Sequence, residues 1–207
     1  MVVLFVHGMG RTPISGWPLL RRLRKAGMKT QSFMYVSAFE DFDSIVARLV
    51  NRIEKLATTD SYVVIGHSLG GVLLRAALSA LPQGTAHPRH IYLLGSPTLP
   101  PRLAIKLKRN FIFRMFTGDC GQLLSSSDRM SAIAPLDVPT TGIAGVRGIP
   151  SSPRYFGQED NDGFVSVSEV SAAWLTDQIQ VQVMHTLLPS SPIVSDIIIE
   201  GLSRNAG

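Results

Sequence analysis

The sequence predicts an α/β fold in which a doubly wound, mostly parallel sheet carries helices on both faces. Three observations lead to this prediction. Short apolar segments typical of strands alternate with longer segments of helical periodicity, no internal repeat interrupts them, and 207 residues suit one domain, residues 1–207. The expected strands are residues 2–6, 29–36, 61–66, 90–95, 139–146 and 178–184, a sheet of about six strands.

The first expected elements are a strand, a helix and a second strand. Residues 2–6 read Val-Val-Leu-Phe-Val, and a short continuous apolar run is typical of a strand buried on both faces. A helix should run from Trp17 to Ala26, because Gly27 offers the left-handed residue at which helices commonly end. Residues 29–36 then follow as the second strand.

Three further helices are expected. Residues 42–57 repeat apolar side chains at i, i+3 and i+4, with Asp41 or Asp43 as the N-terminal cap. Residues 69–80 are good helix formers that follow a strand, and residues 191–203 form the last helix. Because ligands of open α/β sheets bind at the carboxyl ends of strands, functional residues should follow these strands.

The pentapeptide at residues 66–70, Gly-His-Ser-Leu-Gly, fits the pattern Gly-x-Ser-x-Gly between an expected strand and an expected helix. This context places Ser68 on a strained turn with its hydroxyl exposed, at a helix N-terminus that favours negative charge. Gly66 and Gly70 are needed where strand and helix backbones pass too close for a Cβ. The pattern indicates an activated nucleophile for acyl transfer, and the alternative interpretation is a tight turn before a helix.

A second motif follows the first strand, where residues 7–10 read His-Gly-Met-Gly. An apolar strand ending in His-Gly-x-Gly usually supplies an oxyanion donor. With both motifs in place, the chain resembles the α/β-hydrolase superfamily and, within it, small bacterial lipases and esterases. The matching stretches are VLFVHGMG, YVVIGHSLGG, LLGSPTLP, NDGFVSV and MHTLLPSSP, in the expected order along nearly the whole chain.

The resemblance implies both a site and a reaction. Ser68 would be the nucleophile, His185 the base and Asp162 the acid, with the backbone N–H groups of Met9 and Leu69 as the oxyanion hole. The expected reaction is hydrolysis of a carboxylic ester or thioester, from a small-molecule or lipid substrate, through an acyl-enzyme. An acyltransferase on the same scaffold and a catalytically silent binding module are the alternatives.

Other residues compete for roles in this site. Asp160 and Glu159 lie in the same acidic run as Asp162, so Asp160 is the alternative acid. Three nearby carboxylates could bind Ca²⁺, but their spacing is not that of an EF-hand loop, so we expect no metal and no cofactor. His87 and His90 lie in a polar loop and should be solvated.

Composition limits the classes of function. With 45% apolar and 17% charged residues, the chain should be globular, and the single Cys120 should be a packed thiol rather than a nucleophile. The net charge of +5 comes without a nucleic-acid-binding motif, so we expect no nucleic acid partner. Met1 leads directly into a strand without a basic leader, and no apolar run could span a bilayer, so we expect a cytoplasmic protein.

Residues 96–137 form a long excursion between two expected strands. Within it, residues 102–116 are apolar with a basic side, and residues 102–114 hold five cations and no acids. One interpretation is a helix packed on the sheet edge, with its cations in solvent or in weak contact with an anionic membrane surface. The other is a cap whose large apolar side chains, Leu103, Leu107, Phe111, Phe113 and Phe116, line an acyl pocket.

Overall fold

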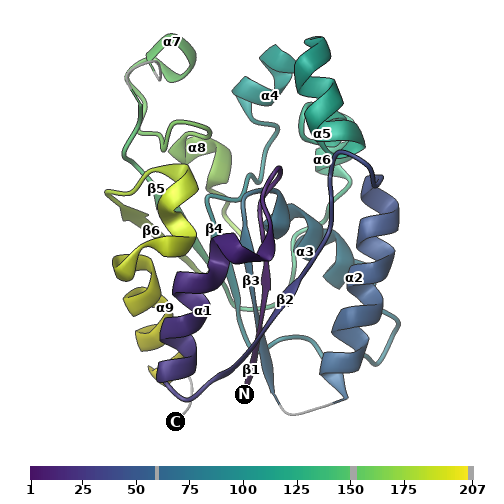
Figure 1. Cartoon of the computed structure of the whole chain (residues 1–207), viewed down its shortest axis with the longest axis vertical. Coiled ribbons are helices and arrows are strands. Elements are labelled where there is room, and N and C mark those ends of the chain that lie inside the picture. The colour runs from purple at the N-terminus through teal and green to yellow at the C-terminus, as the bar shows by residue number, and fades with distance from the viewer. Residues whose placement is uncertain (59–60, 150–152, 205–207) are drawn as a thin grey trace.

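The computed structural model describes residues 1–58, 61–149 and 153–204, and Figure 1 shows their arrangement. Six strands form one sheet in the order β2-β1-β3-β4-β5-β6, and every neighbouring pair is parallel. The strands are β1 (Val2–Val6), β2 (Lys29–Phe33), β3 (Tyr62–His67), β4 (Ile91–Leu94), β5 (Thr140–Gly145) and β6 (Asp177–Val181). The six-stranded parallel sheet predicted from the sequence is therefore confirmed.

Four long helices cover the two faces of this sheet. Helices α1 (Trp17–Lys25) and α9 (Pro192–Arg204) contact each other on one face, and α2 (Phe42–Ala57) and α3 (Leu69–Ser79) contact each other on the other. All four agree with the expected helices. The cap of α2 is Asp41 rather than Asp43, because the Asp41 carboxylate accepts a hydrogen bond from the backbone N–H of Ser44 at 2.8 Å.

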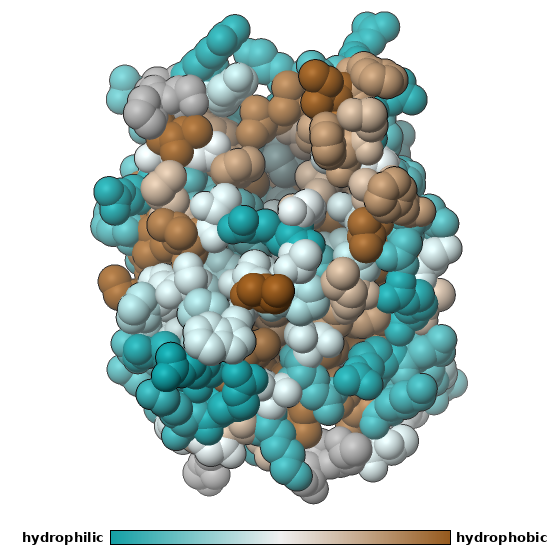
Figure 2. All heavy atoms as spheres, in the orientation of Figure 1, coloured by the Kyte–Doolittle hydropathy of each residue, from teal (hydrophilic) through white to brown (hydrophobic). Residues whose placement is uncertain are grey.

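The remaining helices lie beyond the carboxyl ends of the strands (Figure 1). The excursion contains α4 (Arg102–Leu107), α5 (Phe111–Leu124) and α6 (Ser127–Ser131), followed later by α7 (Pro153–Phe156) and α8 (Val167–Val170). Residues 102–116 are thus two helices rather than one, because Asn110 starts α5 by accepting a hydrogen bond from the N–H of Phe113 at 3.0 Å. Figure 2 shows that the surface is hollowed at this end of the molecule.

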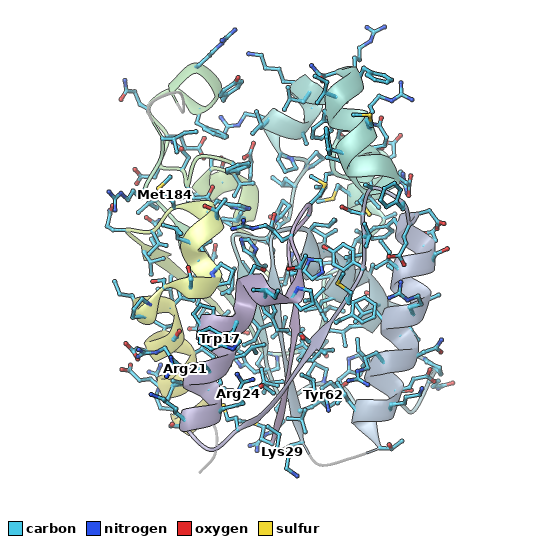
Figure 3. All side chains as sticks on the ribbon, in the orientation of Figure 1. Trp17, Arg21, Arg24, Lys29, Tyr62 and Met184 are labelled. Carbon is cyan, nitrogen blue, oxygen red and sulfur yellow. The ribbon has the colours of Figure 1, made fainter. Side chains whose placement is uncertain are left out.

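Helix α1 shows how the amphipathic helices meet the sheet. Leu19, Leu20 and Leu23 are buried, whereas Arg21 and Arg24 project outward in Figure 3. The Arg21 guanidinium lies 5.3 Å from the centre of the Trp17 ring, and this cation–π contact covers apolar surface without burying the charge. The two short 3-10 helices, η1 (Pro13–Gly16) and η2 (His185–Ser190), flank this helix.

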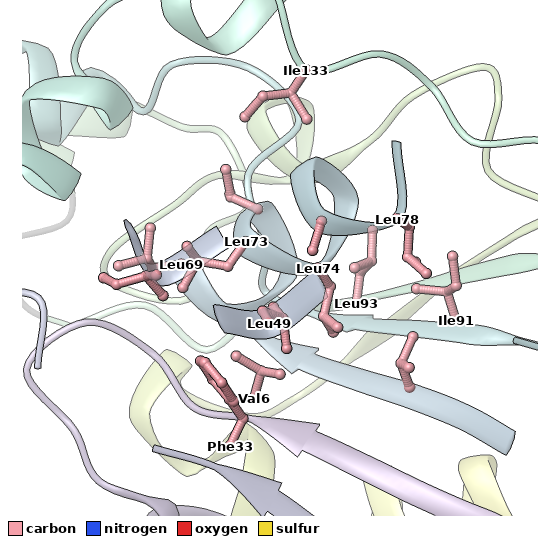
Figure 4. Close-up of a cluster of buried hydrophobic side chains, with 14 of the residues drawn as sticks. Val6, Phe33, Leu49, Leu69, Leu73, Leu74, Leu78, Ile91, Leu93 and Ile133 are labelled. Atoms are coloured by element: carbon pink, nitrogen blue, oxygen red, sulfur yellow. The ribbon is translucent and has the colours of Figure 1, made fainter. Parts of the chain in front are cut away.

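The central strand β1 is buried on both faces, as its continuous apolar run predicted. Val3 and Phe5 pack against α1 and α9, while Val2, Leu4 and Val6 pack on the side of α2 and α3. Figure 4 shows the buried side chains on the side of α2 and α3, where Val6 and Phe33 lie beside leucines of these two helices. The carboxyl end of β1 is therefore held firmly beside the N-terminus of α3.

Two strands end earlier than expected, because groups outside the sheet form hydrogen bonds with the backbone that follows each strand. Beyond β2, Arg48 donates to the carbonyl of Met34 at 2.6 Å, and the N–H of Val36 donates to Glu40 at 2.6 Å. These groups would otherwise extend an edge strand. Beyond β6, the N–H of His185 donates to the carbonyl of Asp162 at 3.0 Å, which draws the chain away from the sheet.

Candidate active site

Ser68 occupies the strained turn between β3 and α3. Its φ of 52° and ψ of −125° make it the one residue other than glycine with positive φ in the described part of the chain, a conformation that persists only where the surroundings enforce it. A Cβ on Gly66 would lie 2.4 Å from the Cα of Gly71, and one on Gly70 would lie 2.2 Å from the carbonyl oxygen of Val6. Both glycines are therefore required by close backbone approach, as the sequence predicted.

His185 and Asp162 form a buried pair beside this turn. Nδ1 of His185 lies 2.6 Å from Oδ2 of Asp162, and their side chains are only 7% and 1% exposed. The other carboxylate oxygen, Oδ1, accepts from the backbone N–H groups of Phe164 at 3.0 Å and Val165 at 2.9 Å. Asp160 is exposed and lies in none of these contacts. Of the two candidate acids, the structure brings Asp162 to the histidine.

This pairing sets the orientation of the imidazole. A carboxylate accepts hydrogen bonds, so the proton of His185 is on Nδ1 and Nε2 is left with a free lone pair. The ring of Phe164 stacks on the imidazole with centroids 5.1 Å apart. A histidine held in this tautomer can take a proton from a neighbouring hydroxyl.

Ser68 and His185 line the same cavity, which has a volume of about 260 Å³. Its far wall comes from the excursion, where Leu103 and Leu107 of α4 and Phe113 of α5 face inward. The expectation that Phe111 and Phe116 also line the pocket is wrong: the two residues are 76% and 63% exposed and lie outside the cavity wall. The enclosed surface is predominantly apolar.

The two residues expected to supply the oxyanion donors both lie near Ser68. Leu69 is the first residue of α3, so its N–H belongs to the first turn, where a helix offers no acceptor. Met9 follows the end of β1 and lines the cavity with Ser68. The contact of Gly70 with the end of β1 brings these two segments together.

His67 contributes a contact that sequence reasoning missed. In the sequence it is a residue beside a glycine turn, and in the structure its Nε2 donates to the backbone carbonyl of His185 at 3.0 Å. Burial, with a smaller effect of the nearby His185, lowers the pKa of His67 well below its usual value. His67 is therefore a neutral donor that ties the Ser68 turn to His185. Its place next to Ser68 in the pentapeptide at residues 66–70 is the only signal in the sequence for this contact.

Arg102 joins the excursion to the loop that carries Asp162. Its side chain is 42% exposed, as expected for the basic side of residues 102–116, but it is paired: Nε donates to Glu169 at 2.9 Å, and the guanidinium also pairs with Glu159. Burial opposes ionisation of Glu159, but hydrogen bonds from Ser168 and Arg102 prevail and lower its pKa to about 2. In the described part of the chain, no three His, Cys, Asp or Glu side chains gather as metal ligands would.

Three other candidate residues, His87, His90 and Cys120, are not among those that line the cavity. His90 is buried rather than solvated, because its Nε2 meets the hydroxyl of Thr141 at 2.8 Å, whereas His87 is exposed as expected. Cys120 is fully buried, and burial raises the pKa of its thiol to about 12. Such a thiol is a poor nucleophile near neutral pH.

Comparison with solved structures shows the same fold at low sequence identity. The RedJ thioesterase of the prodiginine pathway in Streptomyces coelicolor is 16% identical with a TM-score of 0.66, covering 99% of this chain and 90% of that one. The wild-type Vlm2 thioesterase domain is 20% identical with a TM-score of 0.63, covering 100% and 92%. Phospholipase PlaB of Legionella pneumophila is 18% identical with a TM-score of 0.67, covering 83% of this chain but 45% of PlaB.

Comparison with protein sequences gives a family but no individual relative. No curated protein sequence matches this chain significantly. The Alpha/beta hydrolase family matches residues 3–198, which include β1, the Ser68 turn and His185. The chain belongs to the alpha/beta hydrolase family.

Proposed function

We propose that this protein hydrolyses carboxylic esters or thioesters, with Ser68 as nucleophile, His185 as base and Asp162 as the acid that orients it. The observation that carries the proposal is the buried 2.6 Å hydrogen bond between Asp162 and His185, whose ring lines one cavity with Ser68. A histidine fixed by a carboxylate beside a strained serine is the arrangement that nucleophilic acyl transfer needs.

Each step follows from these groups. The oxygen of Ser68 adds to the carbonyl carbon of the substrate while Nε2 of His185 takes the hydroxyl proton. The resulting oxyanion accepts hydrogen bonds from the N–H groups of Leu69 and Met9, each contributing about 3–4 kcal/mol. When the intermediate collapses, the leaving alcohol or thiol takes the proton from His185. Water then attacks the acyl-enzyme by the same route, releasing the acid and restoring Ser68.

Asp162 acts through His185. Its carboxylate holds the imidazole in the tautomer with a free Nε2, and it stabilises the imidazolium that forms during attack. The two backbone N–H groups on its other oxygen keep the carboxylate in place. The burial of the pair strengthens their interaction, because little water screens it.

The cavity supports a substrate with an apolar acyl group. Under this proposal residues 96–137 are a cap, and Leu103, Leu107 and Phe113 contact the acyl chain. Each methylene that becomes buried should add up to about 0.8 kcal/mol of binding free energy. Thioesterases and a phospholipase among the structural neighbours are consistent with ester and thioester substrates.

A chain-length series of p-nitrophenyl esters, with acyl thioesters in parallel, tests the proposal. Activity should rise from acetyl to medium-chain acyl groups, and Ser68→Ala should abolish it, whereas Ser203→Ala on the exposed end of α9 should leave it unchanged. Full activity of folded Ser68→Ala protein would refute the proposed mechanism. A profile that does not depend on chain length would refute the acyl pocket but not the nucleophile.

A further inference from the structure

The outer face of α5 exposes an unusual number of large apolar side chains. Phe111 is 76% exposed, Ile112 62%, Met115 53% and Phe116 63%. We call these four residues the α5 patch. Their spacing places them on one broad side of the helix, with Phe116 at the edge next to Phe113, which faces the cavity. Figure 2 shows apolar side chains gathered over α4 and α5 at this end of the molecule. Contiguous apolar surface of this kind marks an interaction site.

The patch lies on the first half of α5, which meets the core through Phe113 and precedes a break in the helix. The helix breaks at Gly118, with φ 55° and ψ −145°, where a Cβ would lie 2.5 Å from the carbonyl oxygen of Ser37. After the break, Cys120, Leu123 and Leu124 are buried. The segment before the break thus presents its apolar side chains outward, while the segment after it anchors the helix.

The segment that carries the patch is basic, and Asp119, which lies beside Phe111 and Met115, is paired with Arg129. Residues 102–118 contain no aspartate or glutamate. Arg102 pairs with Glu159 and Glu169, but Lys106, Lys108, Arg109 and Arg114 have no ion-pair partner within the described residues. The Lys106 ammonium lies 4.9 Å from the centre of the Tyr155 ring, so Lys108, Arg109 and Arg114 are the cations that accompany the four exposed apolar side chains. Cations beside exposed apolar side chains are the composition of helices that lie in a membrane interface.

We infer that the α5 patch is a docking surface for an anionic lipid bilayer. The apolar side chains would enter the boundary between headgroups and acyl chains, while the flanking lysines and arginines reach the lipid phosphates. In the described residues no helix is long and apolar enough to cross a membrane, so contact is limited to the surface. Charge complementarity selects the anionic bilayer over a neutral one.

The position of the patch relates docking to the cavity. Helices α4 and α5 carry the patch on one side and the cavity wall, Leu103, Leu107 and Phe113, on the other. Docking would therefore bring the apolar wall of the cavity to the lipid surface. Binding itself needs no turnover, so it can be measured on the Ser68→Ala variant and does not depend on the proposed chemistry.

Cosedimentation of the full chain with phosphatidylcholine vesicles, with and without phosphatidylglycerol, tests the inference. We expect binding to the anionic vesicles, weakening as salt rises, and little binding to phosphatidylcholine alone. Phe111→Ser combined with Phe116→Ser should lower the partition coefficient at least about tenfold. Ile193→Ser, at a side chain of α9 that is 54% exposed, is the matched control and should bind like the wild type.

A second pair of variants tests the cations. Arg109→Glu combined with Arg114→Glu should also lower the partition coefficient about tenfold or more. Lys25→Glu combined with Lys29→Glu makes the same change in net charge at the opposite end of the molecule, where Figure 3 shows Lys29. This control should bind the anionic vesicles much more strongly than the Arg109→Glu, Arg114→Glu variant does. Thermal melts should show all these surface variants folded.

Three results would overturn the inference. The first is no binding of the wild type to anionic vesicles. The second is binding that survives both pairs of α5 variants. The third is a dimer in light scattering that the Phe111 and Phe116 changes dissociate, with no vesicle binding, which would assign the patch to a second copy of the chain.

Discussion

Ser68, His185 and Asp162 come from distant parts of the chain, and backbone contacts as well as side chains bring them together. The N–H of His185 donates to the carbonyl of Asp162, and the side chain of His67 donates to the carbonyl of His185. His185 is thus held from both sides, by the Asp162 loop and by the Ser68 turn. In its proposed role as base, His185 would need little rearrangement during catalysis.

The two acids of the same run should differ sharply. Asp162→Asn removes the carboxylate that sets the tautomer of His185, so kcat should fall about ten-thousand-fold. Asp160→Asn alters an exposed side chain outside the pair and should have little effect. Steady-state kinetics of both variants on one ester make the comparison, and a larger loss in Asp160→Asn would show that the acid is misassigned.

His67 should act as a positioning residue. His67→Leu removes the donor to the His185 carbonyl, which should lower kcat about tenfold with KM nearly unchanged, since one hydrogen bond contributes about 0.5–1.5 kcal/mol. His67→Gln keeps a donor and should recover part of the loss. Equal kcat in both variants, or an effect confined to thermal stability, would contradict this role.

Motifs located the central residues, but not the partners that hold them. Ser68 follows from the strand, turn and helix around it, and Asp162 and His185 follow from resemblance and chain order. The His67 and Arg102 contacts were not predictable, because each joins residues far apart in sequence and depends on tertiary geometry. For the same reason His90 was expected in solvent, although it packs against Thr141 of the next strand.

Among the elements, α5 contributes to the cavity wall and carries the exposed patch. A break at Gly118 separates the half of the helix with these side chains from the half that is anchored in the core. Gly118→Ala should destabilise the fold by about 1–3 kcal/mol, because Cβ adds a clash with the Ser37 carbonyl to the strain of positive φ. Gly27→Ala is the matched control, since φ is +86° but nothing lies within 4 Å of the new Cβ. Urea unfolding should show the larger loss in Gly118→Ala, and equal losses would contradict the clash.

The sequence predicted the existence of strands and long helices better than their ends. Apolar periodicity identifies elements that face the core, as for β1 and α2. The end of β2 depends instead on Arg48 and Glu40, whose side chains reach the backbone after the strand. Residues 102–116 read as one apolar helix, whereas the Asn110 cap that divides them is a local signal inside the run.

Across the whole molecule, burial of neutral histidines links stability to pH. Burial lowers the pKa of His7, His67 and His90, so the unfolded chain binds more protons than the folded protein below about pH 6.5. Stability should therefore fall as pH drops from 7.5 to 5.5, by up to about 1.4 kcal/mol per pH unit for each histidine. Urea midpoints over this range measure the slope.

Two variants test whether buried histidines cause this dependence of stability on pH. His90→Gln removes one buried titrating group and should make the pH dependence shallower, whereas His87→Gln changes an exposed residue and should leave it unaltered. A midpoint that is constant or rises on acidification of the wild type would contradict the burial of neutral histidines as the cause.

The account rests on Ser68 as the activated nucleophile, and a fluorophosphonate probe tests this most directly. Mass spectrometry of the labelled wild type should find one adduct, on the peptide containing Ser68, because the probe reacts with a serine whose proton a neighbouring base removes. Ser68→Ala should not be labelled, and His185→Ala should be labelled far more slowly. An adduct on another residue, or no adduct on folded protein, would contradict the account.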